Sequence, residues 1–186
     1  VLGTKENTLY GKGYIEDTLC GLRFRLSSQS FYQVNRTQTE ILYALALEMA
    51  QLTGKETVLD AYCGVGTIGL TMAARASRLI GVELNAQAVR DAQGNAKRND
   101  IRNATFLCDD AGRFLRRCAV GGAALDVVVM DPPRSGSDAA FLQSIGILKP
   151  ERVVYVSCDP ETLARDLKVL HNSGYVMRRA VPVDMF

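Results

Sequence analysis

The sequence has few of the features that mark membrane, secreted, metal-binding or strongly basic proteins. None of its apolar runs is long enough to cross a bilayer, and it does not open with the basic and apolar segment of a secretion signal. Its five cysteines are odd in number and lack the paired spacing of metal ligands, so we expect reduced thiols that mostly fill the core of a cytoplasmic protein, with no metal. The net charge of +2 is too small to indicate nucleic-acid binding by itself. Any polyanionic partner must be held by a local patch or by parts outside this chain.

The 186 residues instead show alternating strand and helix patterns. Glycines punctuate the first 34 residues and predict short antiparallel strands there, followed by a helix from Thr37 to about Leu52. Further strands are expected at 57–60, 79–83, 104–108, 125–130, 153–156 and 175–183, and helices at 66–76, 86–98, 110–118, 138–147 and 160–172. This alternation predicts an α/β, Rossmann-like protein with a mostly parallel sheet and helices on both faces. We expect a β-rich extension over residues 1–35, packed on a domain over 36–186 that contains the parallel sheet.

A glycine turn joins the first strand of that sheet to a helix, in the run DAYCGVGTIGL at 60–70. Gly64 and Gly66 allow the backbone to pass close to a ligand that a side chain would block. The next strand ends in Glu83, where a carboxylate can accept the two hydroxyls of a ribose. A nucleoside triphosphate is disfavoured, because the Gly-Lys-Ser/Thr ending of a phosphate-binding loop is absent. An ordinary strand-to-helix turn and a nicotinamide cofactor both stay open at this point.

Polar residues follow each of the first five strands of the predicted sheet. Because parallel strands end at one edge, these residues should converge on one crevice. The set consists of Asp60, Tyr62 and Gly64 after the first strand, Glu83 after the second, Asp109 and Asp110 after the third, Asp131 after the fourth and Cys158 after the fifth. For Asp109 and Asp110, capping of the next helix explains the residues as well as ligand binding does.

Two later motifs indicate the chemistry. DPPRSG at 131–136 places the Asp131 carboxylate before two prolines, whose fixed φ angles stiffen the loop. SCDPETLARDL at 157–167 places Cys158 just ahead of a helix, where backbone donors and the helix dipole can stabilise a thiolate. Alone, the prolines are also consistent with a strand terminator and the cysteine with a small buried hydrophobe. Their shared edge with the glycine turn favours a functional site.

Together with SSQSFYQVN at 27–35, these motifs resemble the S-adenosylmethionine-dependent RNA uracil-5 methyltransferases over nearly the whole chain. The turn Tyr-Cys-Gly-Val-Gly-Thr-Ile is more similar to the members that modify 23S ribosomal RNA than to the transfer-RNA branch. The resemblance implies a class I methyltransferase fold. It also implies S-adenosylmethionine as cofactor, RNA as partner and 5-methyluridine as product.

The resemblance also assigns roles to residues. Cys158 matches the nucleophile that adds to carbon 6 of uracil, and Asp131 an acid that orients or polarises the base. The positions expected to contact cofactor are Gln33, Tyr62, Gly64, Gly66, Glu83, Asp110 and Asp131, and those expected to contact substrate are Phe31, Gln33 and Arg134. Phe31 can stack on an extruded uracil or simply pack in the core. Arg134 and Arg165 can hold phosphate or ring oxygens, or pair with a nearby acid such as Asp166, and the single histidine, His171, is expected at the surface or as a cap.

Finally, the resemblance implies a fragment of the catalytic domain. In the family, a glutamate in a His-Val-Glu stretch beyond the Asp-Met-Phe end of this sequence removes the carbon-5 proton, and the last sheet strand and an RNA-binding region also lie outside. We therefore expect cofactor binding with poor turnover or a stalled RNA adduct, and self-association or disorder along the open edge at Tyr175–Val183. The alternatives are a methyltransferase acting on transfer RNA or a non-RNA substrate, and a non-catalytic RNA-binding module, which the small charge disfavours.

Overall fold

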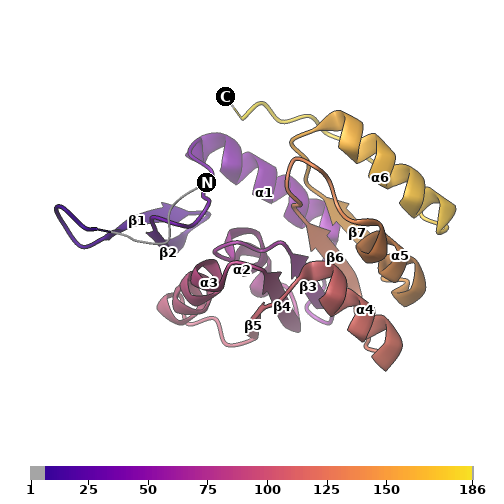
Figure 1. The fold of residues 1–186 in the computed structure, drawn as a ribbon, viewed down its shortest axis with the longest axis horizontal. Helices are drawn as coiled ribbons and strands as arrows, with labels where there is room; N and C mark the ends of the chain where they lie inside the picture. The colour runs from indigo at the N-terminus through magenta and orange to yellow at the C-terminus, as the bar shows by residue number, and fades with distance from the viewer. Residues whose placement is uncertain (1–6, 186) are drawn as a thin grey trace.

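The computed structural model describes residues 7–185 and contains a hairpin followed by a parallel α/β sheet (Figure 1). The hairpin strands are β1 (Tyr14–Leu19) and β2 (Leu22–Ser27). The elements that follow are α1 (Arg36–Ala50), β3 (Thr57–Ala61), α2 (Thr67–Ala73), β4 (Arg78–Glu83), α3 (Ala86–Arg98), β5 (Ala104–Cys108), α4 (Ala111–Gly121), β6 (Val127–Met130), α5 (Ala139–Leu148), β7 (Arg152–Tyr155) and α6 (Pro160–Asn172). The five strands of the sheet lie in the order β5-β4-β3-β6-β7, and every neighbouring pair is parallel.

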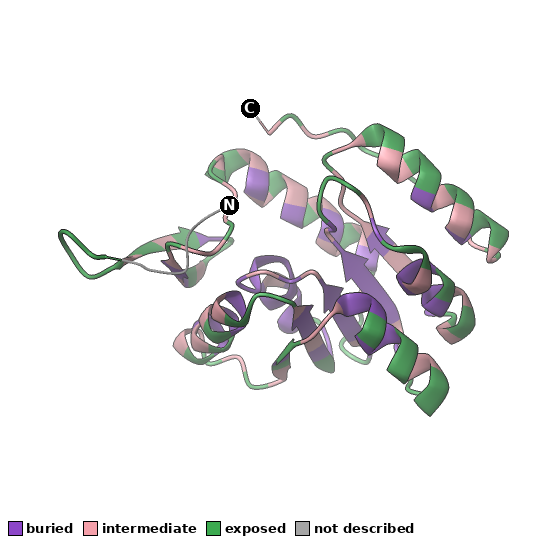
Figure 2. Cartoon of the chain, in the orientation of Figure 1, coloured by how far each residue is buried: buried purple, intermediate pink, exposed green. Residues whose placement is uncertain are grey.

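The middle of the sheet is buried on both faces, which explains why β6, with the sequence VVVM, is apolar throughout (Figure 2). In β6, alternate side chains enter two separate cores: Val127 and Val129 join one, and Val128 and Met130 join the other. The first core lies under α1, α2, α3 and the hairpin, and the second under α4, α5 and α6. The predicted fold class is confirmed.

The hairpin attaches to α3 through a polar stripe. Asn95 and Asn99, four residues apart on one helix face, each accept a backbone N–H of β2 and donate to a carbonyl of the same strand, at Arg25 and Arg23 respectively. The two amides therefore act as a substitute strand along the edge of β2 and satisfy backbone groups that a hairpin leaves open. The hairpin therefore packs on α3, while the division of the chain into an extension over 1–35 and a domain over 36–186 stays a prediction.

The prediction of a final strand over 175–183 is wrong. Residues 175–185 form no regular structure, and most of them are exposed. Pro182 lacks a backbone donor, which disfavours a place inside a sheet. The segment lies beside α1 and does not pair with β7: Arg179 pairs with Glu48 at 2.7 Å, and the Asn35 side-chain amide donates to the Met185 carbonyl. Within the described part of the chain the sheet therefore ends at β7, and self-association through an open edge stays a prediction.

The prediction that the cysteines mostly fill the core is also wrong. All five are free thiols, but only Cys63 is buried. Cys118 is partly covered, whereas Cys20, Cys108 and Cys158 are exposed. Among residues 7–185, no helix combines the length and apolar character needed to span a membrane.

Candidate active site

The glycine turn between β3 and α2 bends through left-handed backbone conformations. Tyr62, Gly64 and Gly66 have φ angles of 61°, 53° and 83°. The left-handed φ angle and tight packing both favour glycine at position 66, since a Cβ there would lie 3.0 Å from the Phe106 ring. A Cβ at Gly64 would meet nothing within 4 Å, so open space faces this backbone. The turn thus has the form expected of a cradle for a ligand that approaches the main chain.

Glu83, at the end of β4, holds this turn in place. One carboxylate oxygen accepts the Gly64 N–H at 3.1 Å, and the other accepts the N–H of Asn85 at 2.7 Å. Asn85 in turn caps α3 by accepting the N–H groups of Gln87 and Ala88. The acid therefore links the turn to the next helix from a partly exposed position beside the open space. Its predicted contact with a ribose stays a prediction.

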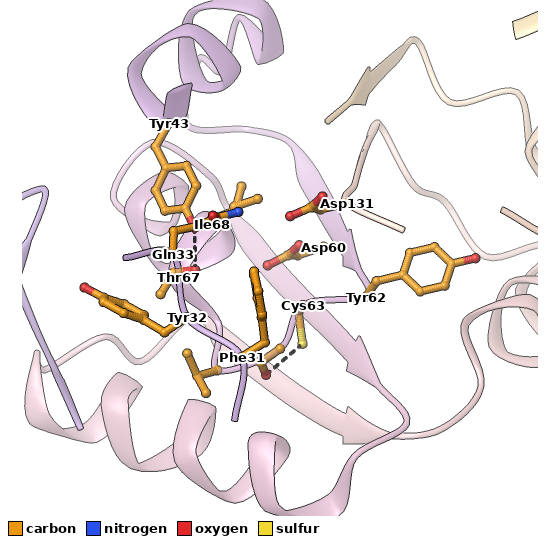
Figure 3. A pocket seen from close by; sticks show the side chains of 12 residues that line it. Phe31, Tyr32, Gln33, Tyr43, Asp60, Tyr62, Cys63, Thr67, Ile68 and Asp131 are labelled. Carbon is orange, nitrogen blue, oxygen red and sulfur yellow. Dashed lines mark hydrogen bonds between the residues drawn. The ribbon is translucent and has the colours of Figure 1, made fainter. Parts of the chain in front are cut away.

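Several residues predicted for the site meet in one cavity of about 40 Å³ (Figure 3). Phe31 and Gln33, which follow the hairpin, lie across it from Asp131, and the carboxylates of Asp60 and Asp131 point into the same space. The lining also includes Tyr62, Cys63, Gly64, Val65, Ile68, Tyr32 and the buried pair Tyr43 and Thr67, whose hydroxyls are 2.7 Å apart. A ligand of cofactor size exceeds this volume and must extend over the strand ends beyond it.

The two carboxyl groups in the cavity have raised pKa values. Burial raises the pKa of Asp131 to about 6. Burial is also the main reason that the pKa of Asp60 rises to about 7; the Gly69 N–H that it accepts at 2.9 Å opposes the shift, while the charges of Asp131 and Glu83 add to it. Near neutral pH this site therefore holds exchangeable protons beside the glycine turn.

Replacing Asp60 with asparagine should change how stability depends on pH. The folded-state pKa of Asp60 lies above the ordinary value of 3.8, so its protonated form favours folding, and this contribution is lost as the pH rises from about 4 through about 7. Relative to wild type, the free energy of unfolding of Asp60→Asn should increase with pH across this window, by at most about 1.4 kcal/mol per pH unit. Urea unfolding at several pH values measures it. Asp100→Asn, at an exposed position, is the control, and a similar pH trend in both variants would contradict the assignment.

Cys158 lies next to this cavity in the topology but does not line it. In the register of β6 and β7, Met130 is opposite Tyr155, and the Val156 N–H donates to the Met130 carbonyl at 2.9 Å. Asp131 and the loop carrying Cys158 therefore leave neighbouring strands at the same edge. The thiol is exposed and precedes Asp159, the N-cap of α6, so it is not a buried hydrophobe.

Other predicted residues have structural partners. Asp110 caps α4 by accepting the Arg113 N–H at 2.8 Å, and Asp109 pairs with Arg117, so the capping explanation is confirmed for Asp110. Arg165 pairs with Asp166 at 2.7 Å. Arg134 has an 84% exposed side chain, with Asp159 3.6 Å away.

The ring of Tyr62 points away from the two acids in Figure 3; it packs on Phe141, and its hydroxyl lies 2.8 Å from that of Ser137. His171 is exposed near the end of α6, as expected. Tyr43 and Thr67 are site residues that sequence reasoning missed. Tyr43 has the spacing of an ordinary core residue of α1, and only the fold brings it to the glycine turn.

The fold by itself places the chain in a broad class, the Rossmann-like α/β proteins. A SAM-dependent methyltransferase from Agrobacterium tumefaciens superposes on 91% of the chain and 60% of its own, with a TM-score of 0.67 at 16% identity, which shows the shared Rossmann-like fold alone. The family model described as tRNA (Uracil-5-)-methyltransferase matches residues 3–186, and the chain belongs to this family. The family predicted from the sequence is confirmed.

Named relatives agree with this assignment. Two of them, each named an uncharacterized RNA methyltransferase, come from Listeria monocytogenes and Halalkalibacterium halodurans; each is 50% identical over the whole chain, which spans 41% of their length. The tRNA (uracil-54, C5)-methyltransferase of Pyrococcus abyssi, solved with S-adenosyl-L-homocysteine, superposes with a TM-score of 0.74 at 32% identity, covering 87% of this chain and 38% of its own. Among the described residues, no cluster of three or more histidine, cysteine or acidic side chains is arranged to hold a metal ion.

Proposed function

We propose that this chain forms the catalytic part of an enzyme that transfers a methyl group from S-adenosylmethionine to carbon 5 of a uridine in RNA. The proposal rests on one observation above all: an exposed thiol, Cys158, and a carboxyl of raised pKa, Asp131, leave adjacent strands beside the glycine turn. Family membership and the relatives named as RNA methyltransferases support it.

The residues present fit the cofactor. Gly64 leaves open space over the backbone, so a nucleoside can approach the turn without a steric conflict. Glu83 offers a partly exposed carboxylate beside that space. When bound, S-adenosylmethionine supplies an activated methyl group. We propose that Gln33, Tyr62, Gly66, Asp110 and Asp131 form the remaining cofactor contacts.

The remaining chemistry requires a nucleophile, because carbon 5 of uracil is unreactive by itself. The Cys158 thiolate adds to carbon 6, and the electron pair of the double bond becomes available at carbon 5, which takes the methyl group. Removal of the carbon-5 proton by a base then restores the double bond and releases the thiolate. Asp131, with its pKa near 6, can hold a proton toward a uracil oxygen and stabilise the negative charge that forms there.

Two further side chains fit an RNA substrate. Phe31 lines the cavity and is 75% exposed, so its ring is available to stack on a base turned out of the RNA. Arg134 is exposed on the loop that follows Asp131 and can contact a phosphate. We propose 23S ribosomal RNA as the substrate, on the basis of the sequence of the turn at 62–68.

Mass spectrometry of RNA tests the proposed function. The full-length protein, incubated with S-adenosylmethionine and unmodified 23S ribosomal RNA, should produce 5-methyluridine at one nucleotide. Transfer RNA serves as the competing substrate. Methylation of transfer RNA alone would overturn the choice of RNA, and methylation only of a ribose, of another base or of a non-RNA substrate would overturn the uracil chemistry.

A further inference from the structure

The Asp166 carboxylate accepts hydrogen bonds from three segments that meet near the proposed active site. Asp166 is only 1% exposed. One of its oxygens accepts the backbone N–H of Ser137 at 2.7 Å and the hydroxyl of Tyr155 at 2.8 Å, and the other accepts Nε of Arg165 at 2.8 Å. These donors belong to the loop after β6, to β7 and to α6. A buried carboxylate with this set of partners fixes the three segments relative to one another.

Arg165 extends the same network along the loop after β6. Its Nη2 donates to the carbonyls of Ser135 and Ser137 at 2.9 and 3.3 Å. Thr162, one turn earlier on α6, donates to the carbonyl of Arg134 at 3.2 Å. The first half of α6 therefore holds the backbone of residues 134–137 at successive positions.

The packing between this loop and the ion pair leaves no room for a side chain. Gly136 has a φ angle of 78°, and a Cβ placed there would collide with Nη2 of Arg165 and lie 2.8 Å from a carboxylate oxygen of Asp166. The glycine of the DPPRSG motif is thus explained by its contact with Arg165 and Asp166. The two motifs that sequence analysis identified separately are parts of one packed unit.

The network connects the groups to which the proposed function assigns the chemistry. Cys158 lies just before the first turn of α6, and Asp131 begins the loop that α6 holds. At the other end of that loop, the Ser137 hydroxyl meets the hydroxyl of Tyr62, in the glycine turn. Attack on carbon 6 requires the thiol and the acid to keep a fixed separation, and a displacement of about 1 Å can cost roughly 100-fold in rate.

We propose that Asp166 and Arg165 are positioning residues that fix the Cys158 loop relative to Asp131; they do not touch the substrate. This inference rests on the proposed function. A role in stability alone is the competing explanation, because removing the partners of a buried carboxylate destabilises a fold wherever it lies. The two explanations differ in what they predict for the rate of adduct formation in a folded variant.

The test uses the full-length protein with 23S ribosomal and transfer RNA transcripts in which 5-fluorouridine replaces uridine. Fluorine replaces the carbon-5 proton whose removal releases the thiolate, so the methylated adduct persists and its formation can be timed on a gel. Asp166→Asn and Arg165→Lys should form the adduct roughly 10- to 100-fold more slowly at saturating RNA and cofactor, with the Kd for S-adenosylmethionine unchanged. Arg165 is half-exposed, so its variant remains informative if Asp166→Asn does not fold.

Tyr175→Phe is the matched control. Its hydroxyl donates to the Pro150 carbonyl at 2.8 Å, at the far end of α6 and β7 from the 134–137 loop, so the variant should lower Tm while keeping the rate of adduct formation. Wild-type rates in both test variants, or an equal loss of rate in Tyr175→Phe, would overturn the positioning role alone. Failure of the wild-type protein to form any adduct would instead overturn the proposed function, and the positioning role with it.

Discussion

Cys158→Ala should abolish covalent trapping of 5-fluorouridine RNA and reduce methyl transfer to normal RNA by at least roughly 1,000-fold, as expected when a covalent nucleophile is removed. The thiol is exposed, and among the described residues it neither donates nor accepts a hydrogen bond. The free energy of unfolding should therefore change by less than about 0.5 kcal/mol. The Kd for S-adenosylmethionine should also stay constant, since this side chain does not line the cavity at the glycine turn.

Cys108→Ala provides a closely matched control for that experiment. Cys108 is also an exposed free thiol, and it ends β5 at the same edge of the sheet, with β4, β3 and β6 lying between its strand and β7. Its variant should trap fluorinated RNA at the wild-type rate. Trapping by Cys158→Ala, or its loss in Cys108→Ala with Cys158 intact, would place the nucleophile elsewhere. Full methylation by Cys158→Ala without trapping would favour a direct methyl transfer, which requires no cysteine.

The sequence predicted the features that depend on local pattern. The sheet, its parallel connections and the convergence of Gly64 and Asp131 on one crevice follow from the alternation of strands and helices, because parallel strands end at one edge. The same reasoning gave a wrong prediction for the tail over 175–183. Its tyrosine and valines are residues that favour a strand, but a strand needs a partner, and the tail lies beside α1, where Arg179 meets Glu48.

The sequence could not predict which side chains would become hydrogen-bonded to residues far away in the chain. Asp110 and Glu83 both follow strands and both look like ligand positions, yet Asp110 caps a helix while Glu83 holds the glycine turn. Asp166 has the spacing and composition of a surface residue of an amphipathic helix, but it is buried because Ser137 and Tyr155 converge on it from other elements. Which acid acquires a buried partner depends on tertiary packing and not on local spacing.

Gly64→Ala should lower the affinity for S-adenosylmethionine by at least tenfold, which corresponds to about 1.4 kcal/mol of binding free energy. The added methyl group would project into the open space over the turn, where no protein atom lies within 4 Å. The protein can therefore accommodate the methyl group, but the methyl group would block the approach of a nucleoside. The φ angle of 53° adds a strain of roughly 1–2 kcal/mol, because L-residues are disfavoured in this conformation. Isothermal titration calorimetry measures the affinity, and urea unfolding measures the strain.

Gly21→Ala separates strain from occlusion. Gly21 lies in the tight turn between β1 and β2, with a φ angle of 77°, and a Cβ added there would meet no atom within 4 Å, so it carries a similar backbone strain away from the cavity. It should lose a similar amount of stability and keep its cofactor affinity. If both variants bind S-adenosylmethionine equally well, the cofactor does not approach the main chain at Gly64. The left-handed φ angle alone would then account for the glycine at position 64.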